Sequence, residues 1–117
     1  MTPIDGPMHG ITDVESYNHY FGWYGGKMED NGPWLDNFHK VHPEICLGVS
    51  EYGCEGILTY HGPNPACKDY SEDYQALYHE HMAKVLEERP WMCGICSTSA
   101  VRSGMRAAWP AGTTRAW

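Results

Sequence analysis

One glutamate stands at a position where an α/β protein could place a catalytic group. Residues 45–50 (ICLGVS) form an apolar run of strand length, and Glu51 follows them directly, beside Tyr52 and Gly53. Parallel α/β barrels carry their catalytic groups at the carboxyl ends of buried strands. A carboxylate there could act as a nucleophile or exchange a proton with a substrate. The alternative is a loop glutamate that only faces solvent.

A cluster of polar and aromatic residues ends an earlier candidate strand. Its members are Asn18, His19, Tyr20, Trp23 and Tyr24. Aromatic faces stack against the C–H groups of sugars and amides hydrogen-bond sugar hydroxyls, so this composition beside a carboxylate suits carbohydrate binding. The same residues could instead pack in the core or at its rim.

Two strands and one helix can be traced around these residues. Residues 11–20 are rich in Val, Ile and Tyr and lead to a glycine pair, which predicts a strand ending in a loop. Pro33 suits the first turn of a helix, and apolar residues at helical spacing continue to Val41, before a proline. The run 45–50 is then predicted to be the second strand.

A second helix is predicted after a loop rich in Gly and Pro. Asp69 is expected to cap it, with Glu72 three residues on in a capping-box pattern. Glu80 and Lys84 can pair on its wetter side, and Pro90 ends it. The expected buried stripe is Tyr74, Leu77, Tyr78, His81, Met82 and Val85. The order strand, helix, strand, helix predicts an α/β fold with a parallel sheet.

Composition excludes several classes of protein. The 117 residues suffice for one domain, and the net charge of −7 disfavours nucleic acid or an anionic membrane as a partner. The sequence shows neither a membrane span nor the layout of a signal peptide, which predicts a cytoplasmic protein. Five cysteines without paired spacing fit a reducing compartment better than a disulfide framework.

Four segments, in order and spacing, resemble glycoside hydrolase family 2 over residues 8–91. They are 17–24 (YNHYFGWY), 33–35 (PWL), 49–53 (VSEYG) and 69–78 (DYSEDYQALY). The resemblance is strongest to the β-galactosidase type, with β-glucuronidase as a related type. It implies a fragment of a (β/α)8 TIM barrel, about strands and helices 6–7, acting on a β-galactoside or related sugar. Full-length members are expected to be homo-oligomers.

The resemblance also implies roles for single residues. Glu51 matches the catalytic nucleophile, and Asn18 and Tyr20 match polar groups that line the same pocket. Tyr20 is expected to hydrogen-bond the nucleophile and Tyr24 to form a wall. His61 matches a family histidine that is expected among the substrate-binding residues, with no more specific role assigned to it. The implied mechanism is retaining hydrolysis through a glycosyl-enzyme, with a second carboxylate about 5–5.5 Å away serving as acid and base.

The sequence departs from the family in one respect. The family's acid/base glutamate follows an asparagine on an earlier strand, and this sequence contains no Asn-Glu pair. The family's magnesium ligands are also expected upstream of this chain, so the sequence predicts no metal or cofactor site of its own. We therefore expect the chain alone to be inactive. A non-catalytic carbohydrate-binding remnant using Tyr20, Trp23 and Tyr24 is the alternative.

The last part of the chain, 92–117, has a different composition from 1–91. It contains no Asp or Glu but three of the eight basic residues, with no helical or strand periodicity. If the reading frame is shifted so that each codon starts at the third base of the present one, the codons for 92–117 can encode the family-like string V-W-N-M-F-D-F. At the family's spacing, the same frame can then encode R-D-E-G-G. We therefore expect an out-of-frame tail after a partial catalytic domain. The plain alternative is a flexible basic tail.

The tail also contains a CxxC motif formed by Cys93 and Cys96. In a reducing compartment this motif could be a redox pair or half of a zinc site. The sequence offers no second ligand pair at finger spacing, and the frame hypothesis makes the motif accidental. A redox or metal protein is therefore the third candidate.

Overall fold

A computed structural model describes residues 4–95 and 101–102 of the chain. Its main elements are β1 (Val14–His19), α1 (Asn31–Val41), β2 (Cys46–Tyr52), α2 (Glu72–Glu87) and β4 (Gly94–Ile95). A short 3-10 helix, η1 (Met28–Asp30), precedes α1. Two-residue strands β3 (Gly56–Ile57) and β5 (Val101–Arg102) pair in parallel with each other. Most of the predicted tail, including Cys96, lies outside the described residues.

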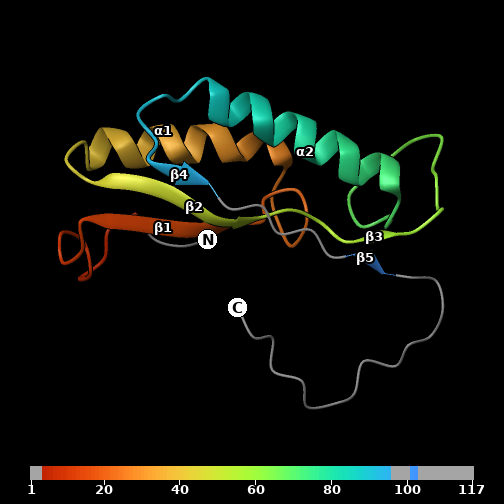
Figure 1. The fold of residues 1–117 in the computed structure, drawn as a ribbon, viewed down its shortest axis with the longest axis horizontal. Helices are drawn as coiled ribbons and strands as arrows, with labels where there is room; N and C mark the ends of the chain where they lie inside the picture. Colours follow the sequence, from red (N-terminus) through yellow and green to blue (C-terminus); the bar gives the residue numbers. More distant parts are fainter. Residues whose placement is uncertain (1–3, 96–100, 103–117) are drawn as a thin grey trace, which may run out of the picture.

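The described strands β1, β2 and β4 form one parallel sheet in the order β1-β2-β4. Figure 1 shows both α-helices on the same side of this sheet. The predicted α/β order of strand, helix, strand, helix is therefore confirmed. The first strand begins at Val14 rather than at 11, because the chain turns at Gly10 (φ +76°) and Thr12 Oγ1 then bonds the Val14 carbonyl oxygen.

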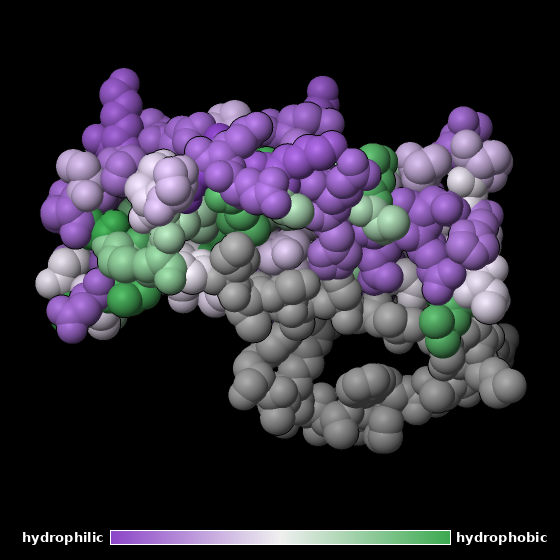
Figure 2. All heavy atoms as spheres, turned by 45° about the horizontal axis from the view of Figure 1, so that its top comes forward, coloured by the Kyte–Doolittle hydropathy of each residue, from purple (hydrophilic) through white to green (hydrophobic). Residues whose placement is uncertain are grey.

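The core lies between the sheet and the two helices. Its fully buried side chains include Leu35, Phe38, Leu47, Val49, Tyr78 and Met82. Tyr17 of β1 meets Trp34 and Phe38 of α1 edge-on, at 5.2 and 5.4 Å between ring centroids. Each large apolar side chain buried in this way contributes roughly 1.5–3 kcal/mol. Hydrophilic side chains cover most of the outer side of the helices (Figure 2).

The start of α2 differs from the prediction. Ser71, not Asp69, is the N-cap, and its hydroxyl accepts a hydrogen bond of 3.0 Å from the Tyr74 backbone N–H. Asp69 instead fixes the position of Ser71, because its carboxylate accepts hydrogen bonds of 2.8 Å from both the backbone N–H and the hydroxyl of Ser71. The capping pattern therefore located the helix but was shifted by two residues.

The buried stripe of α2 was predicted in part. Tyr74, Tyr78, Met82 and Val85 are buried as expected, whereas His81 is only half-buried; Leu86, which was not predicted, is buried too. Leu77 is 42% exposed because it lies at the edge of this stripe rather than at its centre. The expected pair of Glu80 and Lys84 is present, at 2.8 Å. No helix in the described part of the chain is long and apolar enough to span a bilayer.

Candidate functional site

A bulge in β2 sets the direction of Glu51. Tyr17 of β1 lies opposite Val49, but the next pair is Asn18 with Glu51, so Ser50 is one extra residue on β2. An unbroken register would place Ser50 opposite Asn18. Bulges of this kind bend a strand and redirect a side chain, and they are common beside active sites. Here the bulge lets Val49 stay in the core while Glu51 faces the carboxyl end of β1.

Two side-chain hydrogen bonds join the strand ends at this point. The hydroxyl of Tyr20 donates to Glu51 Oε2 at 2.6 Å, and Ser50 Oγ donates to Asn18 Oδ1 at 2.7 Å. The bond to Glu51 is short because its acceptor is a carboxylate. Asn18, Tyr20 and Glu51, which the sequence placed at two separate strand ends, therefore lie together. After Tyr52, the backbone adopts φ +145° at Gly53, a conformation open mainly to glycine.

Tyr24 is held beside Tyr20 by the tight loop that follows β1. The backbone N–H of Tyr24 donates to the carbonyl of Tyr20 at 3.1 Å, and the two rings meet edge-on at 5.0 Å. The Tyr24 side chain is 56% exposed. It can therefore offer a ring face to a ligand, as a wall residue must.

Trp23 does not belong to the candidate site, although the sequence left it available for sugar binding. Its side chain is only 1% exposed and packs against the rings of Tyr70 and Tyr74. The hydroxyl of Tyr74 donates to the carbonyl of Gly22, whose φ of +89° and contact with Met28 leave no room for a side chain. Trp23 therefore anchors the loop to α2, and the proposed stacking role for Trp23 is wrong.

His19 and Asn31 support the loop from the opposite side. His19 is buried, and its Nδ1 lies 3.2 Å from Asn31 Oδ1. Burial lowers the pKa of His19 although the bond to Asn31 opposes this shift, so the ring is neutral at pH 7. The amide of Asn31 also donates to the carbonyls of Phe21 and Met28, at 3.3 and 2.8 Å. Asn31 was missed from sequence, where only its place before a helix start was visible.

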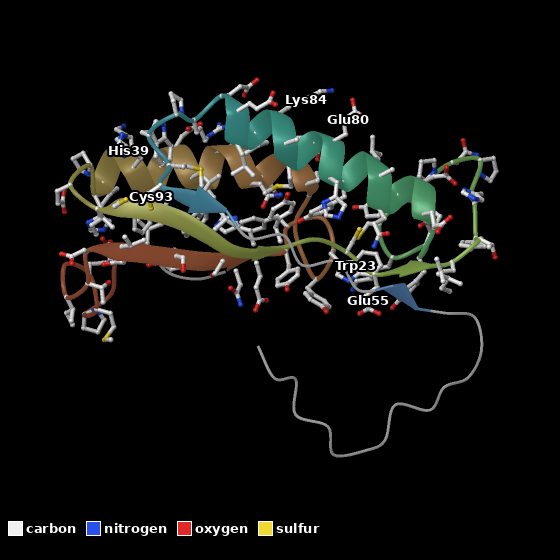
Figure 3. All side chains as sticks on the ribbon, viewed as in Figure 1. Trp23, His39, Glu55, Glu80, Lys84 and Cys93 are labelled. Carbon is white, nitrogen blue, oxygen red and sulfur yellow. The ribbon has the colours of Figure 1, made fainter. Side chains whose placement is uncertain are left out.

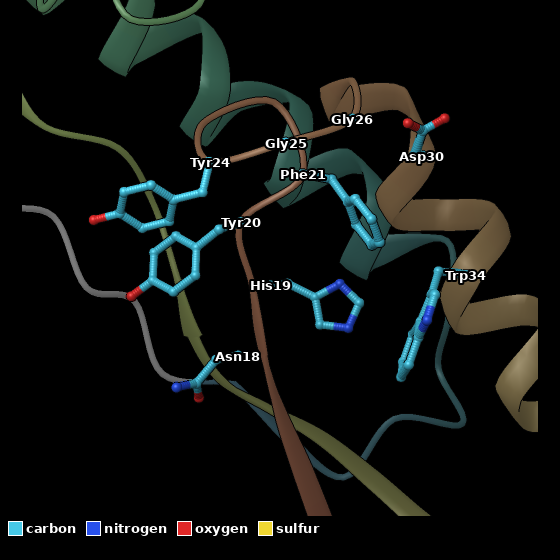
Figure 4. A pocket seen from close by; sticks show the side chains of 9 residues that line it. All are labelled: Asn18, His19, Tyr20, Phe21, Tyr24, Gly25, Gly26, Asp30 and Trp34. Carbon is cyan, nitrogen blue, oxygen red and sulfur yellow. The ribbon is translucent and has the colours of Figure 1, made fainter. Parts of the chain in front are cut away.

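An open pocket of about 400 Å³ lies at the end of β1. It is lined by Asn18, His19, Tyr20, Phe21, Tyr24, Gly25, Gly26, Asp30 and Trp34. In Figure 4, the rings of Tyr20 and Tyr24 lie next to each other, and His19 lies between Tyr20 and Trp34. Glu51 is not a lining residue, and it connects to the pocket through the hydroxyl of Tyr20.

His61 lies outside this arrangement. Its side chain is 65% exposed, with Nδ1 3.1 Å from Asp73 and Nε2 3.3 Å from Glu72, both in the first turn of α2. Asp73 also accepts a bond from the backbone N–H of Gly62 at 2.9 Å. The structure therefore pairs His61 with the helix start and does not bring it into the pocket with Tyr20.

The described part of the chain offers no preformed metal site. Among residues 4–95 and 101–102, no three side chains of His, Cys, Asp or Glu converge closely enough to hold an ion.

This chain shares sequence and fold with known proteins. No protein-family model matches the chain. A β-glucuronidase of Bacteroides fragilis is 36% identical over 96 residues, which cover 77% of this chain and 14% of that protein. The FMN-binding β-glucuronidase of Faecalibacterium prausnitzii L2-6 is 67% identical, with a TM-score of 0.76 over 87% of this chain and 15% of that one. The chain thus spans about one seventh of these relatives.

Two further solved structures bear on the type of sugar. β-Glucuronidase 2 of Bacteroides uniformis, covalently bound to cyclophellitol-6-carboxylate aziridine, is 36% identical, with a TM-score of 0.76 over 80% of this chain and 11% of that one. A Bacteroides fragilis protein provisionally named a β-galactosidase is 25% identical, with a TM-score of 0.71 over 86% of this chain and 15% of that one. The relatives with which this chain shares sequence and fold are thus glycosidases: three β-glucuronidases and one protein provisionally named a β-galactosidase.

Proposed function

We propose that this chain supplies the nucleophile of a retaining β-glycosidase and that the nucleophile is Glu51. The observation that carries the proposal is the 2.6 Å hydrogen bond from Tyr20 to Glu51, made where two neighbouring parallel strands end beside an open pocket. Catalytic groups of α/β barrels lie at such strand ends. The covalent complex of the Bacteroides uniformis β-glucuronidase supports a nucleophilic mechanism among the relatives.

In the proposed reaction, Glu51 attacks the anomeric carbon of the sugar. The bond from that carbon to the leaving oxygen breaks, a glycosyl ester forms on Glu51, and a second carboxyl group gives its proton to the leaving oxygen. The same group then takes a proton from water, which cleaves the ester and restores Glu51. The hydroxyl of Tyr20 fixes Oε2 of Glu51, so that Oε1 can attack. We assign the second carboxyl group to no residue of this chain.

We propose a terminal β-glucuronide as the substrate, because the relatives that are 36% and 67% identical to this chain are β-glucuronidases. A β-galactoside, the sugar that the sequence suggested, is the second candidate, supported by the relative provisionally named for it. Asn18 would bind sugar hydroxyls through its amide, and Tyr24 would stack against a C–H face of the ring. His61 has no part in this proposal, because its ring is paired with Asp73 and Glu72.

A segment exchange tests this proposal in a complete enzyme. Residues 4–91 replace the aligned segment of the Faecalibacterium prausnitzii relative, and the chimera is assayed with aryl β-glucuronide and aryl β-galactoside. We expect hydrolysis of the glucuronide, with Glu51→Gln lowering kcat at least about 10³-fold because it removes the nucleophile. Glu87→Gln, on the exposed end of α2, is the matched control.

The outcomes separate the candidates. A folded chimera whose Glu51→Gln variant keeps full activity would show that Glu51 is not the nucleophile, and preference for the galactoside would replace the proposed sugar. The 117-residue chain alone is expected to hydrolyse neither substrate above its own Glu51→Gln variant, because retaining hydrolysis needs two carboxyl groups. Sugar binding by the chain without hydrolysis, followed by tryptophan fluorescence, would favour the carbohydrate-binding alternative.

A further inference from the structure

Two cysteine thiols meet where the chain enters the third strand of the sheet. Cys46 is the first residue of β2, and Cys93 directly precedes β4, which pairs with β2. The backbone N–H of Cys93 donates to the carbonyl of Leu47 at 2.9 Å, so Cys93 is held beside the start of β2. The neighbouring thiol of Cys46 raises the pKa of the Cys93 thiol, as two thiols close to each other do. Figure 3 shows Cys93 at this edge of the molecule, far from Trp23 and Glu55.

We propose that Cys46 and Cys93 are a redox pair that closes to a disulfide by exchange with a low-molecular-weight disulfide. One thiolate attacks the small disulfide, forms a mixed disulfide and releases one small thiol. The second cysteine thiolate then attacks the mixed disulfide and releases the other small thiol. The two cysteines lose two protons and two electrons in total, and the small disulfide is reduced to two thiols. The proposal is independent of the glycosidase chemistry.

Access distinguishes this pair from the other described thiols. Cys93 is exposed and Cys46 is half-buried, so a small disulfide can reach the pair. Cys54 is 3% exposed, and burial raises the pKa of its thiol to about 12, so Cys54 is inert. Cys67 is exposed, but its thiol points to the carbonyl of Trp23 at 3.7 Å. Cys46 and Cys93 differ from both, because the pairing of β2 with β4 and the bond from the Cys93 N–H to the Leu47 carbonyl place them on neighbouring strands, one residue apart in register.

The local environment also predicts how the exchange depends on pH. Although Cys93 as a residue is exposed, desolvation of its thiol raises its pKa, and the neighbouring thiol of Cys46 raises it further. Because the thiolate is the reacting form, the exchange should be slow at pH 7 and several-fold faster at pH 9. The disulfide would join position 93 covalently to β2, five residues before Glu51.

Oxidised glutathione tests the pair on the full chain. The chain has five cysteines, so oxidation of the pair should leave three free thiols in denaturant and lower the mass by 2 Da. No glutathione should remain bound to the protein. A tryptic digest should then contain peptide 41–68 linked to peptide 85–102, with fragment ions assigning the link to Cys46 and Cys93. This measurement needs no variant, so it does not depend on the folding of one.

Three variants separate this pair from the neighbouring CxxC motif. C96S and C67S should each still lose two free thiols to an internal disulfide. C46S should form no internal disulfide and should bind glutathione instead. An internal disulfide that persists in C46S and disappears in C96S would assign the redox pair to Cys93 and Cys96 and overturn the proposal. A wild-type chain that keeps five free thiols, or only adds glutathione, would overturn it as well.

Discussion

The hydroxyl of Tyr20 donates a hydrogen bond of 2.6 Å to Oε2 of Glu51, across 31 positions of sequence. The bond joins the carboxyl ends of β1 and β2, and it depends on the extra residue, Ser50, that turns Glu51 toward β1. The resemblance to glycoside hydrolase family 2 predicted this bond, and the structure contains it. The role of Glu51 as nucleophile is a proposal that rests on this geometry.

Removing the hydroxyl of Tyr20 should weaken catalysis in the chimera. Hydrogen bonds to charged groups contribute about 1.5–3 kcal/mol, so we expect Tyr20→Phe to lower kcat/KM roughly 10- to 100-fold. Tyr60→Phe, in the exposed loop before α2, is the matched control and should change kcat/KM less than about twofold. Equal effects of the two substitutions would show that the bond to Glu51 does not contribute to the reaction.

Tyr24 should act through its ring rather than its hydroxyl. The ring is exposed beside Tyr20, so Tyr24→Ala is expected to raise KM for an aryl glucuronide roughly 2- to 12-fold, in line with about 0.5–1.5 kcal/mol for an aromatic contact. Tyr24→Phe keeps the ring and should leave KM almost unchanged. If Tyr24→Phe reproduces the effect of Tyr24→Ala, the hydroxyl is the binding group and the assignment of a stacking wall is wrong.

The sequence predicted the order of elements because each has its own local signal. Helical spacing after Pro33 and the apolar run before Glu51 mark α1 and β2 without reference to the rest of the chain. The bulge at Ser50 has no such signal, since register is fixed by pairing with β1. The shift of the cap from Asp69 to Ser71 likewise depends on loop geometry.

The candidate site was predictable only in part for a similar reason. Residue types and order placed Asn18, Tyr20 and Glu51 at strand ends, and parallel strands bring such ends together. Burial of Trp23 and the support from Asn31 depend on contacts with α2 and with the loop carbonyls, which no local pattern records. Local sequence patterns also did not identify the sugar. The names of the relatives, which are β-glucuronidases, favour a glucuronide over the expected galactoside in the proposed function.

The support of the Ser71 cap should make stability depend on pH. Burial opposes ionisation of Asp69, but bonds from the backbone N–H groups of Ser71 and Ala66 and from the Ser71 hydroxyl outweigh it and lower the pKa of Asp69. A lowered pKa in the folded state means that the stabilisation is present above about pH 4 and is lost as pH falls further. Asp69→Asn should therefore cost about 1 kcal/mol at pH 6 and less at pH 2, where more of the carboxyl group is protonated.

Urea unfolding of the full chain at both pH values measures this difference. Asp13→Asn, on an exposed turn, is the control for the lost charge and should have little effect at either pH. A cost of Asp69→Asn that is the same at pH 2 and pH 6 would contradict a role for the ionised carboxylate.

Arg89 should stabilise the packing of α2 on α1. Its guanidinium donates two bonds to the carboxylate of Asp36, at 2.8 and 2.7 Å, and a third to the carbonyl of Val85 at 2.5 Å. Lysine keeps the charge but not the two-pronged geometry, so Arg89→Lys should cost about 1 kcal/mol of unfolding free energy. A double-mutant cycle with Asp36→Asn measures the coupling, and a coupling of zero would show that the pair contributes nothing.

Covalent labelling of the chimera tests the central assignment most directly. The chimera is treated with the cyclophellitol-6-carboxylate aziridine that is bound to the Bacteroides uniformis relative, digested with trypsin and sequenced by mass spectrometry. We predict one label, in peptide 41–68 and on Glu51, which is absent from Glu51→Gln and retained in Glu87→Gln. A label on another residue, or one that survives Glu51→Gln, would contradict the assignment of Glu51 as the nucleophile.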